Sequence, residues 1–237
     1  MQAAVNQCLE WCRGPREPHT VITVNAAILC MMRRDAALRE ACVRGNLIVA
    51  DGMSVVWTSR LAGTPVPERV TGVDLMSRLL AAASERRLGV YFLGATAAVL
   101  TELVRRCARD YPGLTVVGAR DGYFDSSEQE DVATRIRRSA PHLLFVGMPS
   151  PFKETWCERH REVLDVPVIM GVGGTFDVLA GHLRRAPRLA QSMGLEWSWR
   201  LAMEPRKMWK RYLLTNTEYV WLAAGEILRR RLARARR

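Results

Sequence analysis

The sequence predicts an α/β fold in which a mostly parallel sheet is covered by helices. Three observations favour this class: short apolar runs alternate with amphipathic stretches, most runs end at a glycine, and the alternation repeats about six times without an internal sequence repeat. Strand, glycine and helix in this order are typical of parallel sheets, because helices connect neighbouring parallel strands. Ligands of such sheets bind at the carboxyl ends of the strands, so the residues after each run are the candidates for chemistry.

The expected strands are short and rich in β-branched residues. They cover Val21–Val24, Leu47–Val49, Val90–Leu93, Leu114–Val117, Leu143–Val146 and Val166–Met170. The first run is followed by Asn25, the second leads to Asp51-Gly52, and each of the other four ends at a glycine.

The stretches between these runs have apolar residues at helical spacing. Expected helices cover Ala26–Val43, Gly72–Arg86, Ala97–Asp110, Ser127–Arg138 and Pro151–Leu164. After Gly194 no strand signal remains, and Asn216–Leu232 is expected to form one long helix that leads into an arginine-rich tail. We therefore expect two domains, an α/β domain over residues 1–194 and a basic, Trp-rich helical appendage over residues 195–237.

Composition and charge exclude several classes of protein. The chain has 237 residues, of which 49% are hydrophobic and 25% charged, which excludes wholesale disorder and collagen-like sequence. No apolar run reaches the ~18 residues needed to span a bilayer, and the first residues do not resemble a signal peptide. The six cysteines form no CxxC pair and are expected to be free thiols in a reducing cytoplasm.

The net charge of +11 is concentrated at the C-terminal end. Leu195–Arg237 holds 11 Lys and Arg against 4 Asp and Glu. Such a segment suits anionic lipid headgroups, nucleic acid or a phosphate-bearing substrate, and composition does not choose among them. Arginines bind phosphate oxygens bidentately, and the neighbouring tryptophans suit a wet interface, a sugar face or packing inward beside a solvated basic helix.

Polar residues follow the first two expected strands. Thr23 and Asn25 close the first strand, where they can bind a polar ligand, although Asn25 is also a good N-cap for the next helix. Asp51 closes the second strand, where it can act as a general base or bind a sugar hydroxyl, or cap the helix expected near Met53.

Two loops are further candidates. Arg69, Thr71 and Asp74 lie in a charged loop that either lines a pocket or forms a surface turn. Gly171–Asp177 is a glycine turn after the last strand, and its backbone N–H groups are suited to a diphosphate. The turn is not GxGxxG. The motifs GxxxxGK[ST], GxSxG, HExxH and DxD are absent as well, and the histidines lack ligand spacing, so no metal site is expected.

Several motifs occur in a fixed order along the chain. They are Thr23-x-Asn25, Ala50-Asp51-Gly52-Met53, Pro67-Glu68-Arg69-Val70-x-Gly72-x-Asp74, Gly118-x-x-x-Gly122-Tyr123-Phe124, Gly147-Met148-x-Ser150-Pro151-x-x-Glu154, Gly171-Val172-Gly173-Gly174-x-Phe176-Asp177 and Gly194-Leu195-Glu196-Trp197-x-x-Arg200. Together they resemble the WecG/TagA/CpsF glycosyltransferase family (glycosyltransferase family 26), from about residue 20 to residue 214.

This resemblance implies a Rossmann-like α/β domain and an inverting transfer that forms a β-linkage. The donor would be a UDP-sugar and the acceptor a polyprenyl-diphosphate-linked saccharide at the cytoplasmic face of the membrane, without metal or other cofactor. In this family Asp51 would be the general base, with Thr23 beside it. Residues implied to bind substrate are Asn25, Arg69, Thr71, Asp74, Gly147, Ser150, Lys153, Glu154, Gly171, Gly173, Gly174 and Asp177. Arg200, Arg206 and Arg211 would bind the UDP diphosphate.

The chain also departs from the family pattern. Ala27 stands where an acidic or polar residue is frequent, Phe152-Lys153 where Lys-Gln is usual, and Ser54 where Gly is frequent. These departures leave open whether the donor carries N-acetylmannosamine or another hexose, used in exopolysaccharide assembly.

We expect a peripheral enzyme on the anionic surface of the inner face of the cell membrane. The sequence does not decide whether it forms a homo-oligomer. Two other classes compete with it. A nicotinamide-dependent oxidoreductase has a similar sheet, but the chain lacks GxGxxG after the first strand. A basic nucleic-acid-binding module would explain the tail, but no known nucleic-acid-binding motif accompanies it, so no nucleic-acid partner is expected.

Overall fold

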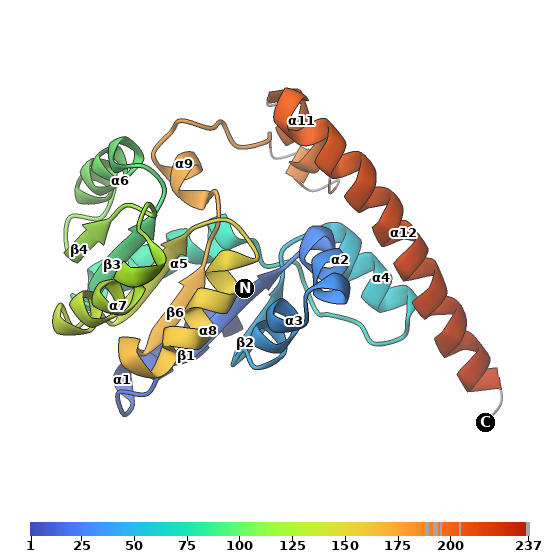
Figure 1. The fold of residues 1–237 in the computed structure, drawn as a ribbon, viewed down its shortest axis with the longest axis horizontal. Coiled ribbons are helices and arrows are strands. Elements are labelled where there is room, and N and C mark those ends of the chain that lie inside the picture. Colours follow the sequence, from blue (N-terminus) through green and yellow to red (C-terminus); the bar gives the residue numbers. More distant parts are fainter. Residues whose placement is uncertain (188–189, 192–193, 195, 204, 236–237) are drawn as a thin grey trace. The chain divides into compact units, whose positions relative to one another are not determined.

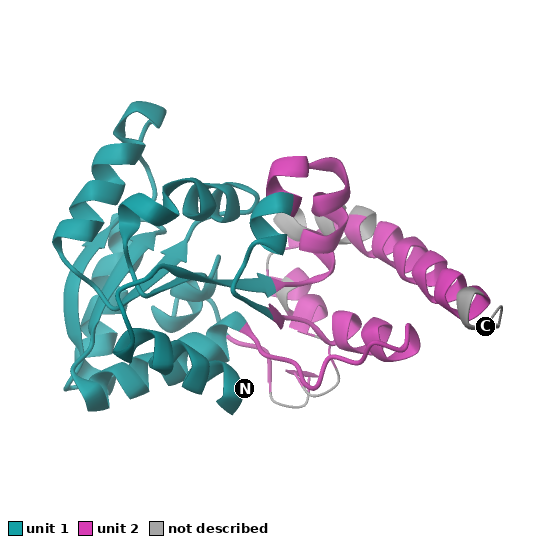
Figure 2. Ribbon diagram, turned by 90° about the horizontal axis from the view of Figure 1, so that it is seen from below, with its two compact units in different colours: residues 1–23, 40–48, 72–184 teal, residues 24–39, 49–71, 185–237 magenta. Residues whose placement is uncertain are grey.

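The computed structural model describes residues 1–187, 190–191, 194, 196–203 and 205–235 (Figure 1). Side chains are described for these residues except residues 200, 206–208, 210–214 and 233–235. The chain divides into two compact units, shown in Figure 2. Unit 1 comprises residues 1–23, 40–48 and 72–184, and unit 2 comprises residues 24–39, 49–71 and 185–237.

The sheet has six strands, all parallel, in the order β2-β1-β6-β5-β3-β4. The strands are β1 (His19–Val24), β2 (Leu47–Ala50), β3 (Gly89–Gly94), β4 (Thr115–Arg120), β5 (Leu143–Gly147) and β6 (Val168–Gly171). Each overlaps one predicted run, so the predicted parallel α/β fold is confirmed. The strands are nearly continuous apolar runs because helices cover the sheet.

Within unit 1 the two faces of the sheet pack against different helices. Side chains alternate along β3, so Tyr91 and Leu93 join a buried cluster with residues of α7 (Gln129–Arg138) and α8 (Phe152–Leu164). Phe92 points the other way and meets Phe176 edge-on, with ring centroids 5.7 Å apart. Phe176 belongs to α9 (Thr175–Leu179), which packs against α5 (Gly72–Arg86) and α6 (Ala97–Asp110). Helices therefore lie on both faces.

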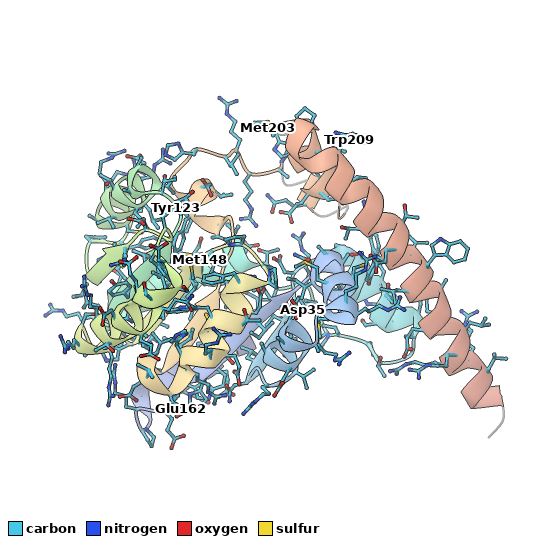
Figure 3. All side chains as sticks on the ribbon, viewed as in Figure 1. Asp35, Tyr123, Met148, Glu162, Met203 and Trp209 are labelled. Atoms are coloured by element: carbon cyan, nitrogen blue, oxygen red, sulfur yellow. The ribbon has the colours of Figure 1, made fainter. Side chains whose placement is uncertain are left out.

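The long helix predicted over Ala26–Val43 is wrong. The structure has two helices, α2 (Ala26–Arg34) and α3 (Ala36–Val43), separated by Asp35 (Figure 3). The Asp35 carboxylate accepts a hydrogen bond from the Leu38 N–H at 2.9 Å. An aspartate that binds the amide three residues on behaves as an N-cap, so it starts a new helix instead of continuing the old one.

The other predicted helices are present with small shifts. α5 and α6 match their predicted bounds, α7 is preceded by the short 3₁₀ helix η1 (Ser126–Glu128), and α8 begins one residue after Pro151. The first helix, α1 (Gln2–Arg13), was not predicted. It packs against α5 and buries Ala4, Val5, Cys8 and Leu9, a helical spacing that its polar residues obscure.

Unit 2 holds α2, α4 (Met53–Leu61), α11 (Glu196–Met203) and α12 (Pro205–Ala235). α12 is longer than predicted and packs against α2 and α4. Tyr219 anchors it: the side chain is buried, and its hydroxyl lies 3.1 Å from Ser54 O and 3.0 Å from Thr58 Oγ1. Arg34 and Glu218 form an ion pair at 2.8 Å. In the described part of the chain, no helix is both long and apolar enough to cross a bilayer.

Candidate functional site

The end of β2 places Asp51 among other predicted site residues of unit 2. The Asp51 N–H donates to Val24 O at 2.8 Å, which holds Asp51 beside the residue before Asn25. The Val70 N–H donates to Ala50 O at 2.9 Å, so the segment Arg69–Thr71 lies beside the end of β2. Backbone hydrogen bonds therefore bring Asp51, Asn25, Arg69 and Thr71 into one neighbourhood.

The sequence offered Asn25 and Asp51 as possible helix N-caps, and only Asn25 occupies an N-cap position. Asn25 is the N-cap of α2, and its Oδ1 accepts from the Ile28 N–H at 3.1 Å. This bond uses the carbonyl oxygen, and the amide N–H donors take no part in it. The N-cap of α4 is Gly52, not Asp51, so Asp51 lies one residue before the cap position.

Arg69 is held by Glu196, an acidic residue of the Gly194–Arg200 motif for which the sequence predicted no role in the site. The Arg69 Nη1 lies 2.8 Å from Glu196 Oε2, and the Arg69 side chain is only 15% exposed. Arg185 Nε lies 3.9 Å from the other oxygen of the same carboxylate. Glu196 begins α11 and lies in the first turn of the helix, where a carboxylate is favoured. This position and the family motif were the sequence signals for it.

In unit 1, Thr23 and Gly171 meet where β1 and β6 end. Thr23 is buried, and its hydroxyl donates to Gly171 O at 3.3 Å. The glycine turn continues through Gly173, whose φ of +53° is left-handed and strains any other residue. A Cβ at Gly173 would meet no atom within 4 Å, so this part of the turn faces open space.

A buried charged cluster lies next to this turn. Lys153 and Glu154 are 5% and 4% exposed and form an ion pair with each other. Lys153 Nζ donates to Ser150 Oγ at 2.5 Å, and Ser150 Oγ donates to Glu154 Oε1 at 2.8 Å. The second oxygen of Glu154 is buried and has no hydrogen-bond partner in the structure.

The remaining predicted site residues of unit 1 lie on separate elements. Gly147 ends β5, and a Cβ there would lie 2.4 Å from Phe176, so packing alone requires a glycine. Asp74 lies in the first turn of α5, and Asp177 in the first turn of α9. Figure 3 labels Tyr123 and Met148, which follow β4 and β5. The substrate-binding role of these residues stays a prediction.

The predicted diphosphate arginines belong to unit 2. The backbone of Arg200 lies in α11, and the backbones of Arg206 and Arg211 lie in α12. Their side chains lie outside the described residues. Among the side chains that are described, no three His, Cys, Asp or Glu gather as ligands for a metal ion.

Comparison with known proteins gives a consistent result. The sequence pattern of the glycosyl transferase WecG/TagA/CpsF family matches residues 1–233. The chain is 34% identical over 200 residues to the N-acetylglucosaminyldiphosphoundecaprenol N-acetyl-β-D-mannosaminyltransferase of Bacillus spizizenii, covering 84% of this chain and 76% of that relative. The protein of the same name from Bacillus subtilis is 32% identical over 193 residues, covering 81% and 74%. The chain therefore belongs to the WecG/TagA/CpsF family of glycosyltransferases.

Proposed function

We propose that this enzyme transfers an N-acetylmannosaminyl residue from a UDP-sugar to a polyprenyl-diphosphate-linked N-acetylglucosamine in the assembly of a cell-surface polysaccharide. The observation that carries the proposal is the family match over residues 1–233, together with two relatives whose names state this transfer. The grouping of Asp51 with Asn25, Arg69 and Thr71 supports a site at the end of β2.

In the proposed reaction Asp51 is the general base. Its carboxylate takes the proton of the acceptor hydroxyl as that oxygen attacks the anomeric carbon of the donor. The bond between the anomeric carbon and the diphosphate oxygen breaks, UDP leaves, and the configuration inverts to a β-linkage. We assign Thr23 as a second catalytic residue, in addition to Asp51.

The departure of UDP requires groups that stabilise the negative charge on its diphosphate. We assign this task to the backbone N–H groups of the glycine turn and to Arg200, Arg206 and Arg211. Asn25, Arg69, Thr71, Asp74, Gly147, Ser150 and Asp177 are assigned to substrate binding. Arg206→Ala or Arg211→Ala should then weaken UDP affinity measured by calorimetry, whereas unchanged affinity in both variants would remove these arginines from the donor site.

The donor sugar is proposed from the names of the two relatives. Phe152 is 37% exposed and can touch a ligand, whereas Lys153 is buried. A panel of UDP-sugars with a short-chain polyprenyl-diphosphate N-acetylglucosamine, analysed by mass spectrometry, tests the assignment. We expect the N-acetylmannosamine donor to give the fastest transfer. Preference for another hexose would show that the departures at Ala27, Phe152 and Lys153 changed the donor.

We further propose that α12 docks the enzyme on the anionic inner face of the cell membrane. Beyond the buried Tyr219, the helix exposes Trp221, Leu228 and Leu232, whose spacing of seven and four residues places them on one face. Arg229, Arg230 and Arg231 lie among them. An apolar stripe with basic neighbours is typical of helices that lie in the headgroup region, which is where a lipid-linked acceptor is found.

The family match over residues 1–233 makes the chain a glycosyltransferase and rules against the nicotinamide-dependent oxidoreductase considered from the sequence. Titration of the protein with UDP and with NADH, followed by tryptophan fluorescence, checks this result. We expect saturable binding of UDP and none of NADH.

A further inference from the structure

Lys153 occupies a position that disfavours a cation. It is the second residue of α8, at the positive end of the helix dipole, where a positive charge is unfavourable. The Lys153 side chain is also buried, with only 5% of its surface exposed. Moving a cation out of water costs free energy, and the ion pair with Glu154 offsets only part of that cost. Both the position in the helix and the burial of the charge disfavour a lysine here. A residue that is unfavourable for stability in two ways indicates a role in function.

The Lys153 side chain supports the first residue of the glycine turn. A Cβ built on Gly171 would lie 3.1 Å from Lys153 Cε and 3.3 Å from Cδ, so the lysine chain passes directly along the Gly171 backbone. The carbonyl of Gly171 accepts from Thr23 Oγ1. Gly171 is therefore held by β1 through its carbonyl and by α8 through the Lys153 methylene groups.

The same cluster borders a small, partly open pocket between β1, β6 and α8. A cavity of about 10 Å³ is lined by backbone and side chains of Thr20–Thr23, Lys153, Glu154, Cys157, Ile169 and Gly171. This is too small for a sugar and close to the lower limit for one water molecule. Glu154 Oε2, buried without a partner, belongs to one of the lining residues. Neither Lys153 nor Glu154 thus has room to hold a substrate group directly.

We propose that Lys153 and Glu154 are positioning residues: they fix Gly171, and through it the glycine turn that binds the donor diphosphate. Ser150 locks the pair by accepting from Lys153 and donating to Glu154. The inference rests on the proposed function for the identity of the ligand. It reassigns Lys153 and Glu154 from contact with substrate to support of the backbone that makes this contact.

The test replaces both charges together. Removing one partner would strand the other charge, whereas replacing a buried ion pair by apolar residues of similar volume is often neutral for stability. We therefore expect Lys153→Met/Glu154→Leu to fold with an unchanged melting temperature. Methionine has a similar volume but lacks the ammonium group through which Ser150 and Glu154 hold the Lys153 chain along Gly171, so the support of Gly171 should be lost. Its KM for the UDP-sugar should rise at least tenfold while its KM for the lipid acceptor stays within twofold. Wild-type donor KM in the folded variant would overturn the inference.

A matched control is available on the same helix. Glu158 of α8 pairs with Arg44 at 3.0 Å, and neither residue borders the cavity next to Gly171. Arg44→Met/Glu158→Leu removes an ion pair from α8 without touching the turn, so it should keep the wild-type donor KM. A tenfold rise in this control as well would show that any loss of an α8 ion pair has the effect, which contradicts the specific role of Lys153 and Glu154.

Two further measurements keep the outcome decisive. If Lys153→Met/Glu154→Leu does not fold, Lys153→Met/Glu154→Gln takes its place, because glutamine keeps an acceptor for Ser150 while both charges are removed, and donor KM should again rise. Hydrogen exchange of the amides of residues 171–175 should be at least tenfold faster in the pair variant, and an unchanged rate would overturn the inference. This readout needs no substrate, so it stays valid if the wild type transfers no sugar, a result that contradicts only the proposed function.

Discussion

A backbone hydrogen bond holds Asp51 at the end of β2. Its N–H binds Val24 O, and the cap position of α4 belongs to Gly52. Asp51→Asn keeps the shape of the side chain and removes its ability to take a proton. We expect turnover to fall by roughly 10²–10⁴-fold, with an unchanged melting temperature and an unchanged affinity for UDP. Steady-state kinetics and calorimetry measure these quantities.

Asp35 provides the matched control for this change. It lies in unit 2 as well, and asparagine is as good an N-cap as aspartate, so Asp35→Asn should keep both the start of α3 and the turnover. Normal turnover in a folded Asp51→Asn protein would remove Asp51 from the role of base.

His142 makes the stability of unit 1 depend on pH. Its Nδ1 accepts from the Gly89 N–H at 3.0 Å, and burial, together with the charge of Arg16, lowers the pKa of His142 below its usual 6.5. Because the folded state resists protonation, the neutral ring stabilises the fold above pH 6.5, and this stability is lost as the pH falls below that value.

His142→Asn isolates this effect, because the asparagine oxygen can accept from Gly89 but does not titrate. Urea unfolding at pH 7.5 and pH 5.5 should show that the free energy of unfolding of the wild type falls more than that of the variant. Equal losses in the two proteins would show that other groups cause the pH dependence.

Candidate site residues could be predicted from the sequence more readily than the residues they pair with in the fold. Asn25 as a cap and Asp51 at a strand end follow from local patterns, because the signals lie within four residues. The ion pair of Arg69 with Glu196 joins residues 127 positions apart, and no local pattern reports it. Burial of Lys153 was equally out of reach, because a lysine at a helix start is normally solvated and only the fold encloses this one.

At the scale of elements, strands were easier to predict than helix boundaries. The four inner strands β1, β6, β5 and β3 are buried over nearly their whole length, and such continuous apolar runs leave a strong signal. The break at Asp35 was missed because the apolar spacing of Ala26–Val43 continues through it, and the aspartate acts by a hydrogen bond that periodicity does not contain. α1 was missed because its exposed face is polar, which hides the four buried residues.

The exposed stripe of α12 can be tested without removing the helix. Deleting residues 216–237 would also remove Tyr219, which anchors α12 on α4. Trp221→Ser/Leu228→Ser/Leu232→Ser changes only exposed residues. We expect this variant to lose most of its sedimentation with anionic vesicles, and wild-type sedimentation to weaken as salt rises because the basic residues contribute.

Tyr219→Phe serves as the control for α12. It removes the hydroxyl that contacts Ser54 and Thr58, so it should lower the free energy of unfolding by about 1 kcal/mol and leave vesicle binding intact. Equal sedimentation of the wild type and the triple serine variant would contradict docking through this stripe.

In the proposed reaction of the whole molecule, arginines and backbone amides stabilise the negative charge of the leaving diphosphate. Transfer should therefore continue at a similar rate after treatment with EDTA. Initial rates with EDTA, Mg²⁺ and Mn²⁺ check this expectation. A rate that falls to background with EDTA and returns with one metal ion would show that a metal stabilises the leaving diphosphate.

We propose that the enzyme catalyses an inverting transfer from a UDP-sugar to a lipid-linked acceptor. It is tested most directly by the product that the wild-type enzyme forms from UDP-N-acetylmannosamine and a short-chain polyprenyl-diphosphate N-acetylglucosamine. Mass spectrometry should show the gain of one N-acetylhexosaminyl residue, and NMR should show a β configuration at the new linkage. A product with the α configuration of the donor, or no product with any UDP-sugar, would contradict the account.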